Sequence, residues 1–144
     1  MAEPPIDETT PFGRRVAERL RTESLVWLTT VGRDGAPQPN PVWFLWDGGD
    51  GVVVYNAVSA YRMRHIRERP QVSLNFNSDA HGDDIAVLRG RAAEAPDLPS
   101  SDRNPEFQAK YGAAIRDSLR KSPEEFAHEY PHKLRITIEG VRGF

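Results

Sequence analysis

The stretch that decides the fold is residues 25–44, LVWLTTVGRDGAPQPNPVWF. Its first part, residues 25–31, is rich in β-branched and aromatic side chains and is short enough for a strand. Gly32-Arg33-Asp34-Gly35 supplies the residue types of a tight turn. A second extended run follows from Ala36 to Asp47. The pattern predicts that a β-hairpin opens the sheet.

Prolines alternate along the second extended run, at Pro37, Pro39 and Pro41. A proline has no N–H to donate to a neighbouring strand, and it is tolerated in sheets mainly at edges and bulges. The three proline nitrogens are therefore expected to face away from the partner strand. This places the first half of the run at an edge of the sheet, or makes it a bulged segment.

The second half of the same run is apolar on both faces. Because successive strand residues face opposite sides, Trp43 and Leu45 are expected on one face, and Phe44 and Trp46 on the other. Both faces must then be covered. One cover is the interior of a barrel, and the other is a helix, a ligand or a second subunit.

The rest of the chain continues the pattern of short strands and short helices. Several strands are joined by tight loops, and residues 71–77 alternate polar and apolar without a break, which is typical of antiparallel strands. The predicted fold is mainly β with short peripheral helices, a six-stranded and mostly antiparallel barrel. Residues 1–9 are predicted to be a flexible tail and residues 10–144 a single domain. The expected strands are 25–31, 36–47, 52–55, 71–77, 85–93 and 134–141, and the expected helices are 11–23, 60–69, 105–119 and 123–130.

Two of these helices have sequence signals at their starts. Thr10 is the expected N-cap of the first helix, with Pro11 at its first helical position. Ser59 is expected to cap the helix from about Ala60 to Arg69, which Pro70 ends.

Composition excludes several function classes. The chain has 144 residues, and its 19 Lys and Arg against 21 Asp and Glu give a net charge of -2. This argues against a dedicated nucleic-acid-binding protein. The absence of cysteine excludes disulfides, thiolate catalysis, zinc fingers and iron–sulfur clusters. No apolar run approaches the length of a membrane span, and the first residues lack the features of a secretory signal, so a cytoplasmic location is expected.

A zinc-protease pattern in the sequence is interpreted as accidental. Residues 128–132, HEYPH, match H-E-x-x-H, a motif that needs both histidines on one face of a continuous helix. Pro131 lies inside that turn and is incompatible with a helix interior. A helix end followed by a strand start is expected instead. The acidic loop 81–84, HGDD, is likewise interpreted as a solvated loop, and no metal site is predicted.

The arginines after the third strand are more informative. Asn56, Ser59 and Arg62 fall where a strand gives way to a helix N-terminus, and free N–H groups there favour an anion. The Ser59 hydroxyl and the Arg62 guanidinium add directed hydrogen bonds, so the junction is a candidate phosphate site. The alternative is an ordinary solvated basic face that also carries Arg64 and Arg67.

Three stretches, in this order, resemble the pyridoxamine 5′-phosphate oxidase-like split-barrel family. Residues 25–44 are similar to its opening hairpin. Residues 54–76, VYNAVSAYRMRHIRERPQVSLNF, resemble its phosphate-binding segment, in which a Ser and then a basic residue open a helix. Residues 88–92, LRGRA, resemble a later strand of the family. The resemblance covers about residues 12 to 142 and implies a split barrel of the FMN-binding type.

Within the family, the chain is most similar to the branch that uses the deazaflavin coenzyme F-420. The segment 122–126 followed by the strand at 134–137 also resembles that branch. The resemblance implies that Ser59 and Arg62 contact the cofactor phosphate, and that residues 41–43 lie along the ring system. The cofactor-binding residues expected on this basis are Pro41, Val42, Trp43, Tyr55, Asn56, Ser59, Arg62 and Met63.

The function implied is a homodimeric, F-420-dependent oxidoreductase that passes a hydride from the reduced deazaflavin to a small conjugated acceptor. The long anionic tail of a deazaflavin further implies that Arg64 or Arg67 lines an open groove. Oxidation of pyridoxamine phosphate is not expected, because Ile85 or Ala86 stands where the pyridoxamine oxidases place a Gln near the flavin. Two alternatives remain open, an FMN-binding oxidoreductase and a non-enzymatic binder of a cofactor, a tetrapyrrole or a fatty acid. Tyr111 or a histidine is a candidate proton donor, and no catalytic residue is predicted.

Overall fold

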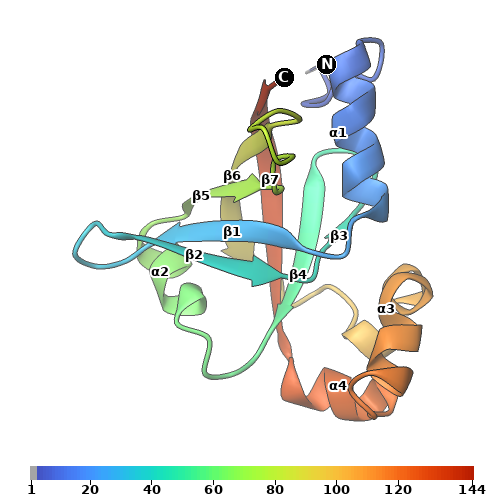
Figure 1. Ribbon diagram of the computed structural model, residues 1–144. Coiled ribbons are helices and arrows are strands. Elements are labelled where there is room, and N and C mark those ends of the chain that lie inside the picture. The colour runs from blue at the N-terminus through green and yellow to red at the C-terminus, as the bar shows by residue number, and fades with distance from the viewer. Residues whose placement is uncertain (1–2) are drawn as a thin grey trace.

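The computed structural model describes residues 3–144 as a curled antiparallel sheet with short helices around it (Figure 1). The sheet order is β2-β1-β5-β6-β7-β4-β3, and each neighbouring pair is antiparallel. The strands are β1 (Val26–Val31), β2 (Pro37–Val42), β3 (Leu45–Trp46), β4 (Gly51–Asn56), β5 (Gln71–Asn75), β6 (Ala86–Glu94) and β7 (His132–Gly143). The helices are α1 (Pro11–Thr22), α2 (Arg62–Glu68), α3 (Pro105–Asp117) and α4 (Pro123–Glu129), with a 3-10 turn η1 (Ser101–Arg103).

The expected fold class is confirmed, but the strand count is seven rather than six. The expected run 36–47 breaks after Val42, and its last part, β3, pairs with β4 at the opposite edge of the sheet. The two edge strands are thus separated only by Trp43 and Phe44. Because one edge leads directly into the other, the sheet has to curl into a half-barrel. We call residues 43–44 the seam.

Strand β2 is the exposed edge that its prolines predict. It pairs with β1 alone, from Val26 opposite Val42 to Val31 opposite Pro37. In an antiparallel strand the N–H and C=O of one residue point to the same side. The residues between the prolines therefore donate to β1, and the prolines turn carbonyl oxygens but no N–H outward. The free edge lacks the donors that another strand would need.

Two apolar cores lie on opposite faces of the strands around the seam. Val52, Val54 and Phe44 belong to the larger core inside the barrel, together with α1 residues such as Leu20. The smaller core joins Tyr55 on β4 to Phe107, Tyr111 and Ile115 on α3 and to Phe126 on α4. Trp43, Leu45 and Val53 pack against it. The expected alternation of residues 43–46 is confirmed, and the second cover consists of helices α3 and α4.

The helix starts follow the capping signals in all but one case. The Thr10 hydroxyl accepts a hydrogen bond from Gly13 N–H at 2.9 Å, and α1 ends next to Glu23, as predicted. The prediction for Ser59 is wrong, because α2 begins only at Arg62, and its N-cap position, Tyr61, makes no side-chain capping bond. Packing decides where this short helix begins, since its buried residues are Met63 and Ile66.

Side chains of α2 also tie it to the neighbouring strand β1. His65 Nδ1 lies 2.9 Å from the hydroxyl of Thr30, and Arg69 Nε donates to the carbonyl of Val31 over 2.9 Å. These contacts fix the helix that carries Arg62.

Residues just before α1 contact the rest of the domain. Met1 and Ala2 of the expected tail 1–9 lie outside the described residues. Ile6 is buried in the barrel core, and the Asp7 carbonyl accepts from Thr10 N–H at 3.2 Å. Polar, Pro-rich composition predicts a flexible segment at residues 1–9, and the buried side chain of Ile6 is a contact with the core that this composition does not reveal.

The local structure agrees with the interpretation that the zinc-protease pattern is accidental. Helix α4 ends at Glu129 and β7 begins at His132, so the two histidines do not share a helix. Within residues 3–144, no group of three or more His, Asp or Glu side chains is arranged to hold a metal ion. None of the helices in that range has the length and apolar character needed to cross a bilayer.

Candidate functional site

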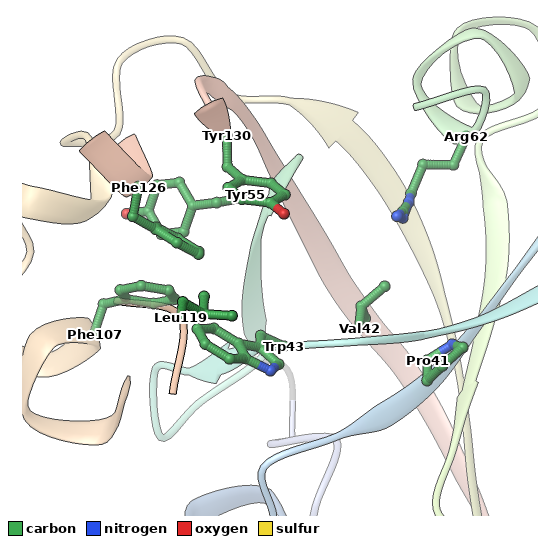
Figure 2. Close-up of a pocket in the computed structure, with 9 residues that line it drawn as sticks. All are labelled: Pro41, Val42, Trp43, Tyr55, Arg62, Phe107, Leu119, Phe126 and Tyr130. Carbon is green, nitrogen blue, oxygen red and sulfur yellow. The ribbon is translucent and has the colours of Figure 1, made fainter. Parts of the chain in front are cut away.

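A pocket of about 310 Å³ opens where the seam meets α2, α3 and α4. Figure 2 shows Arg62 on one side of it and the rings of Phe107 and Phe126 on the other. The pocket therefore has a cationic end and an aromatic end. Its lining residues are Pro41, Val42, Trp43, Tyr55, Arg62, Phe107, Leu119, Phe126 and Tyr130.

The cationic end consists of an unsatisfied guanidinium. Arg62 Nε and Nη1 are buried and have no hydrogen-bond partner in residues 3–144. Burial lowers the pKa of Arg62, because the charged form has lost solvation. An arginine nevertheless stays protonated, and a guanidinium offers paired N–H donors to a phosphate or a carboxylate. The group that best fits this end is therefore an anion.

The aromatic end is a set of stacked rings. The Trp43 indole lies 4.5 Å from the Tyr111 ring at an angle of 6°, and 5.5 Å from Phe126 at 17°. Phe126 stacks in turn on Tyr130 at 4.6 Å. Because each ring is held by a neighbour, this end of the pocket is organised in advance. An aromatic lining of this kind is suited to an apolar ring of a ligand.

Tyr55 is fixed at its hydroxyl as well as by its ring. The hydroxyl donates to the Pro99 carbonyl over 2.9 Å and accepts from Asn104 Nδ2 at 3.1 Å. Its ring meets Phe107 edge to face at 4.9 Å. Burial raises the pKa of Tyr55, which favours the neutral phenol that these two hydrogen bonds require.

The structure brings part of the expected cofactor-binding set into this pocket. Pro41, Val42, Trp43, Tyr55 and Arg62 line it. The remaining three, Asn56, Ser59 and Met63, lie outside it.

Each of those three has another environment. Asn56 is buried and donates through Nδ2 to the carbonyls of Val54 and His132, which ties β4 to β7. Met63 packs in the barrel core and also borders a second cavity. Ser59 is exposed and borders that second cavity as well.

The sequence did not single out the residues that the two late helices add to the pocket. Phe107, Leu119, Phe126 and Tyr130 come from α3, α4 and the turns that follow them. Phe126 and Tyr130 are one helical turn apart, which is a signal of a buried face. Nothing in that spacing shows which cavity the face lines. Leu119, at 40% exposure, carries no signal.

Tyr111, a candidate proton donor from the sequence, has a structural role. Its hydroxyl accepts from Phe44 N–H at 2.9 Å and lies within hydrogen-bond distance of the carbonyls of Ser24 and Phe44, at 2.8 and 2.9 Å. Burial raises the pKa of Tyr111 to about 12. The hydroxyl is therefore committed to the backbone of the seam and is poorly placed to release a proton.

A second cavity of about 310 Å³ lies on the other side of α2. Its basic residues are Arg64, Arg67 and His132, and Arg67 is paired with Glu94 through Nε at 3.1 Å. Arg64 and Arg67, which were expected to line an open groove, both border this cavity. Its lining residues are Val58, Ser59, Ala60, Tyr61, Met63, Arg64, Arg67 and His132.

Comparison with known proteins adds a sequence family and a shared fold. The sequence pattern described as pyridoxamine 5′-phosphate oxidase matches residues 12–143. No curated protein matches the chain.

Several solved structures resemble this one. A conserved hypothetical protein of Mycobacterium tuberculosis superimposes with a TM-score of 0.70 at 18% identity, over 99% of this chain and 86% of that one. An F420 reductase gives 0.65 at 20% identity, over 87% and 94%. The heme storage protein HutZ of Vibrio cholerae gives 0.63 at 16% identity, over 93% and 95%. At such identities the likeness concerns the fold alone.

Proposed function

The chain belongs to the pyridoxamine 5′-phosphate oxidase family, and on that premise we propose that it is an F-420-dependent reductase. In this proposal it passes a hydride from the reduced deazaflavin to a small conjugated acceptor. The observation that carries the proposal is the guanidinium of Arg62, without a partner in residues 3–144, at one end of a pocket lined by aromatic side chains. A shared fold with an F420 reductase supports it.

The proposed roles follow from where the side chains lie. Arg62 binds the cofactor phosphate, and Pro41, Val42 and Trp43 lie along the ring system. Ser59 supplies a further hydroxyl from the neighbouring cavity. A reduced deazaflavin, when bound, supplies two electrons and a proton as one hydride. The chain binds and orients the ring and keeps water from it, which requires no nucleophile and no metal ion.

Two further residues support the site from behind in this proposal. Asn56 holds the end of β4 in place through its bonds to backbone carbonyls. Met63 anchors α2 in the barrel core, beneath Arg62.

The second cavity favours a deazaflavin over FMN. Arg64 and His132 lie beside Ser59 there, and neither has a carboxylate partner among the ion pairs of residues 3–144. A cofactor with an extended anionic tail gains contacts from such a groove, whereas the single phosphate of FMN is served by Arg62. We also propose that the protein is a homodimer, as the resemblance to the family implies.

The test is a titration of the purified protein with F-420 and with FMN, followed by fluorescence. We expect F-420 to bind more tightly. Arg62→Ala removes a charge-assisted contact and is expected to weaken F-420 binding by about 1.5–3 kcal/mol, roughly ten- to a hundredfold. Arg33→Ala, in the exposed turn after β1, is the matched control and should bind as the unaltered protein does.

Other results of this titration would contradict particular parts of the proposal. Unchanged affinity of a folded Arg62→Ala protein would show that the phosphate lies elsewhere. Tighter binding of FMN would reverse the choice of cofactor. Tight binding of either cofactor without reduction of any conjugated acceptor would favour a non-enzymatic binding protein.

A further inference from the structure

One buried side chain joins two walls of the pocket. Asn104 is 8% exposed and uses both ends of its amide. Its Oδ1 accepts from Phe107 N–H at 3.1 Å and so caps α3. Its Nδ2 donates to the Tyr55 hydroxyl at 3.1 Å. Asn104 itself does not line the pocket.

The two residues that Asn104 contacts are lining aromatics from different parts of the chain. Tyr55 comes from β4 in the barrel, and Phe107 comes from α3. Their rings meet edge to face at 4.9 Å, with an angle of 72° between the planes. The helix cap sets the position of the Phe107 backbone, and the amide N–H sets the position of the Tyr55 ring. One side chain therefore fixes the relative placement of both rings.

No equivalent constraint acts on Tyr55 from its own strand. The hydroxyl makes two hydrogen bonds, one to Asn104 and one to the carbonyl of Pro99, and both partners precede α3. Without the Asn104 donor, the hydroxyl keeps one partner and the ring gains freedom to turn. Since Phe107 also packs against Phe126 at 5.9 Å, the disorder would reach the α4 side of the pocket.

We propose that Asn104 is a positioning residue, which sets the affinity of the pocket for a planar ring without touching that ring. The statement that the ring belongs to F-420 rests on the proposed function. The ordering of Tyr55 and Phe107 by Asn104 does not depend on it.

The test separates capping from positioning. Asn104→Ser keeps a good helix cap, but its hydroxyl is too short to reach Tyr55 as well. Tyr55→Phe removes the hydroxyl and keeps the ring. Each change is expected to weaken F-420 binding about three- to tenfold. Both changes remove the hydrogen bond between Asn104 and Tyr55, and Tyr55→Phe also removes the one to Pro99. The double variant should therefore bind F-420 as weakly as Tyr55→Phe alone.

A second readout does not need a cofactor. Near-ultraviolet circular dichroism of the cofactor-free protein reports how rigidly the aromatic rings are held. Asn104→Ser should reduce this signal. Tyr55→Phe is unsuitable for this readout, because it removes the tyrosine chromophore as well as the hydrogen bond to Pro99. Thr10→Ala is the matched control, since it removes a helix cap far from the pocket, and it should lower the unfolding temperature while leaving both readouts unchanged.

The results distinguish the two proposals. If neither F-420 nor FMN binds the unaltered protein, the proposed function fails, and the dichroism still tests the role of Asn104. If the dichroism of Asn104→Ser is unchanged, or if the losses in the double variant add, Asn104 is only a helix cap and the positioning role is wrong.

Discussion

At Phe44 the backbone has left one edge strand and not yet joined the other, so its polar groups need partners outside the sheet. Two residues of α3 provide them. Phe44 N–H donates to the Tyr111 hydroxyl over 2.9 Å, and Lys110 Nζ donates to the Phe44 carbonyl over 3.0 Å. Buried backbone groups without partners are costly. Helix α3 therefore stabilises the seam as well as covering it.

Lys110 should make stability depend on pH. Burial lowers the pKa of Lys110 from 10.5 to about 8, so the folded protein releases this proton more easily than the unfolded chain does. The penalty of the buried charge is fully present below about pH 8 and is relieved as the pH rises towards 10.5. We expect the free energy of unfolding in urea to rise from about pH 7.5 to about pH 9.5, and to rise less in Lys110→Met.

A second lysine serves as the control for this measurement. Lys121 is paired with Glu129, which raises its pKa, so it stays protonated in both states over the same range. Lys121→Met should therefore keep the pH dependence of the unaltered protein. An equal rise in stability for Lys110→Met and the unaltered protein would show that Lys110 is not the titrating group.

Arg62 and Ser59 show how far single residues can be placed from sequence. Their spacing correctly put a cation beside the end of β4, and Arg62 faces the pocket. Ser59 was assigned to the same ligand on the assumption that it caps the helix. In the structure the helix begins two positions later than expected, because Met63 and Ile66 anchor it, and Ser59 faces the second cavity. A capping residue predicts where a helix can start, but packing decides whether it does.

The pairing of β6 with β7 contains a local irregularity with an energetic consequence. Arg89 pairs with Gly140 and Gly90 with Ile138, so Glu139 of β7 is the extra residue, as in a β-bulge. A Cβ atom at Gly90 would lie 2.5 Å from the backbone oxygen of Thr137. We expect Gly90→Ala to lower the free energy of unfolding by about 1–3 kcal/mol, because backbone atoms have to move.

Gly112 provides the matched comparison inside α3. Its Cβ would meet nothing closer than 3.5 Å, the distance to Gln108 Oε1. Alanine is the better helix former, so Gly112→Ala is expected to stabilise by about 0.5–1 kcal/mol. Urea denaturation of both variants checks the pair. A neutral effect of Gly90→Ala would mean that the strand pair relaxes easily at the bulge.

The elements differ in how much of them the sequence could predict. Helices α1, α3 and α4 each start with a proline, after a side chain that caps them, and these local signals were sufficient. The break between β2 and β3 was missed. It depends on the curl of the whole sheet, since residues 36–47 are uniformly compatible with an extended chain. Local sequence signals predicted where the helices and strands lie. The division of residues 36–47 into β2 and β3, at opposite edges of the sheet, depends on the tertiary structure.

For the whole molecule, we expect a homodimer. The apolar face formed by Trp43 and Leu45, one sequence argument for self-association, is covered by α3 and α4. The free edge of β2 lacks outward N–H groups, so the sheet cannot extend there into a second copy. Association should therefore use side-chain surfaces. Light scattering after size-exclusion chromatography should give twice the chain mass of 16.2 kDa, and a monomer mass at micromolar concentration would contradict the proposal.

The pocket itself is a product of the whole molecule. The quoted stretches of sequence supplied Trp43 and Arg62, which belong to the barrel and to α2. Phe126 and Tyr130 are brought in by α4, and no pattern within a single element indicates which cavity they line. The sequence thus singled out Arg62 and part of the aromatic lining, Trp43 and Tyr55, whereas the part that α3 and α4 contribute required the three-dimensional arrangement. In Figure 1, α3 and α4 lie together at one end of the molecule, away from both chain ends.

Residues 96–131 connect two positions that are paired in the sheet. This segment contains η1, α3 and α4. Glu94 is opposite Leu134, and Ala95 N–H still donates to the Lys133 carbonyl over 2.9 Å. In the topology of the sheet, this segment is a long hairpin loop between β6 and β7. The entropic cost of closing such a loop rises only slowly with its length. A different insert between the same two strand ends would replace Phe107, Phe126 and Tyr130 and leave Arg62 and Trp43 in place. Such an insert would also have to supply partners for the N–H and carbonyl of Phe44, which α3 provides here.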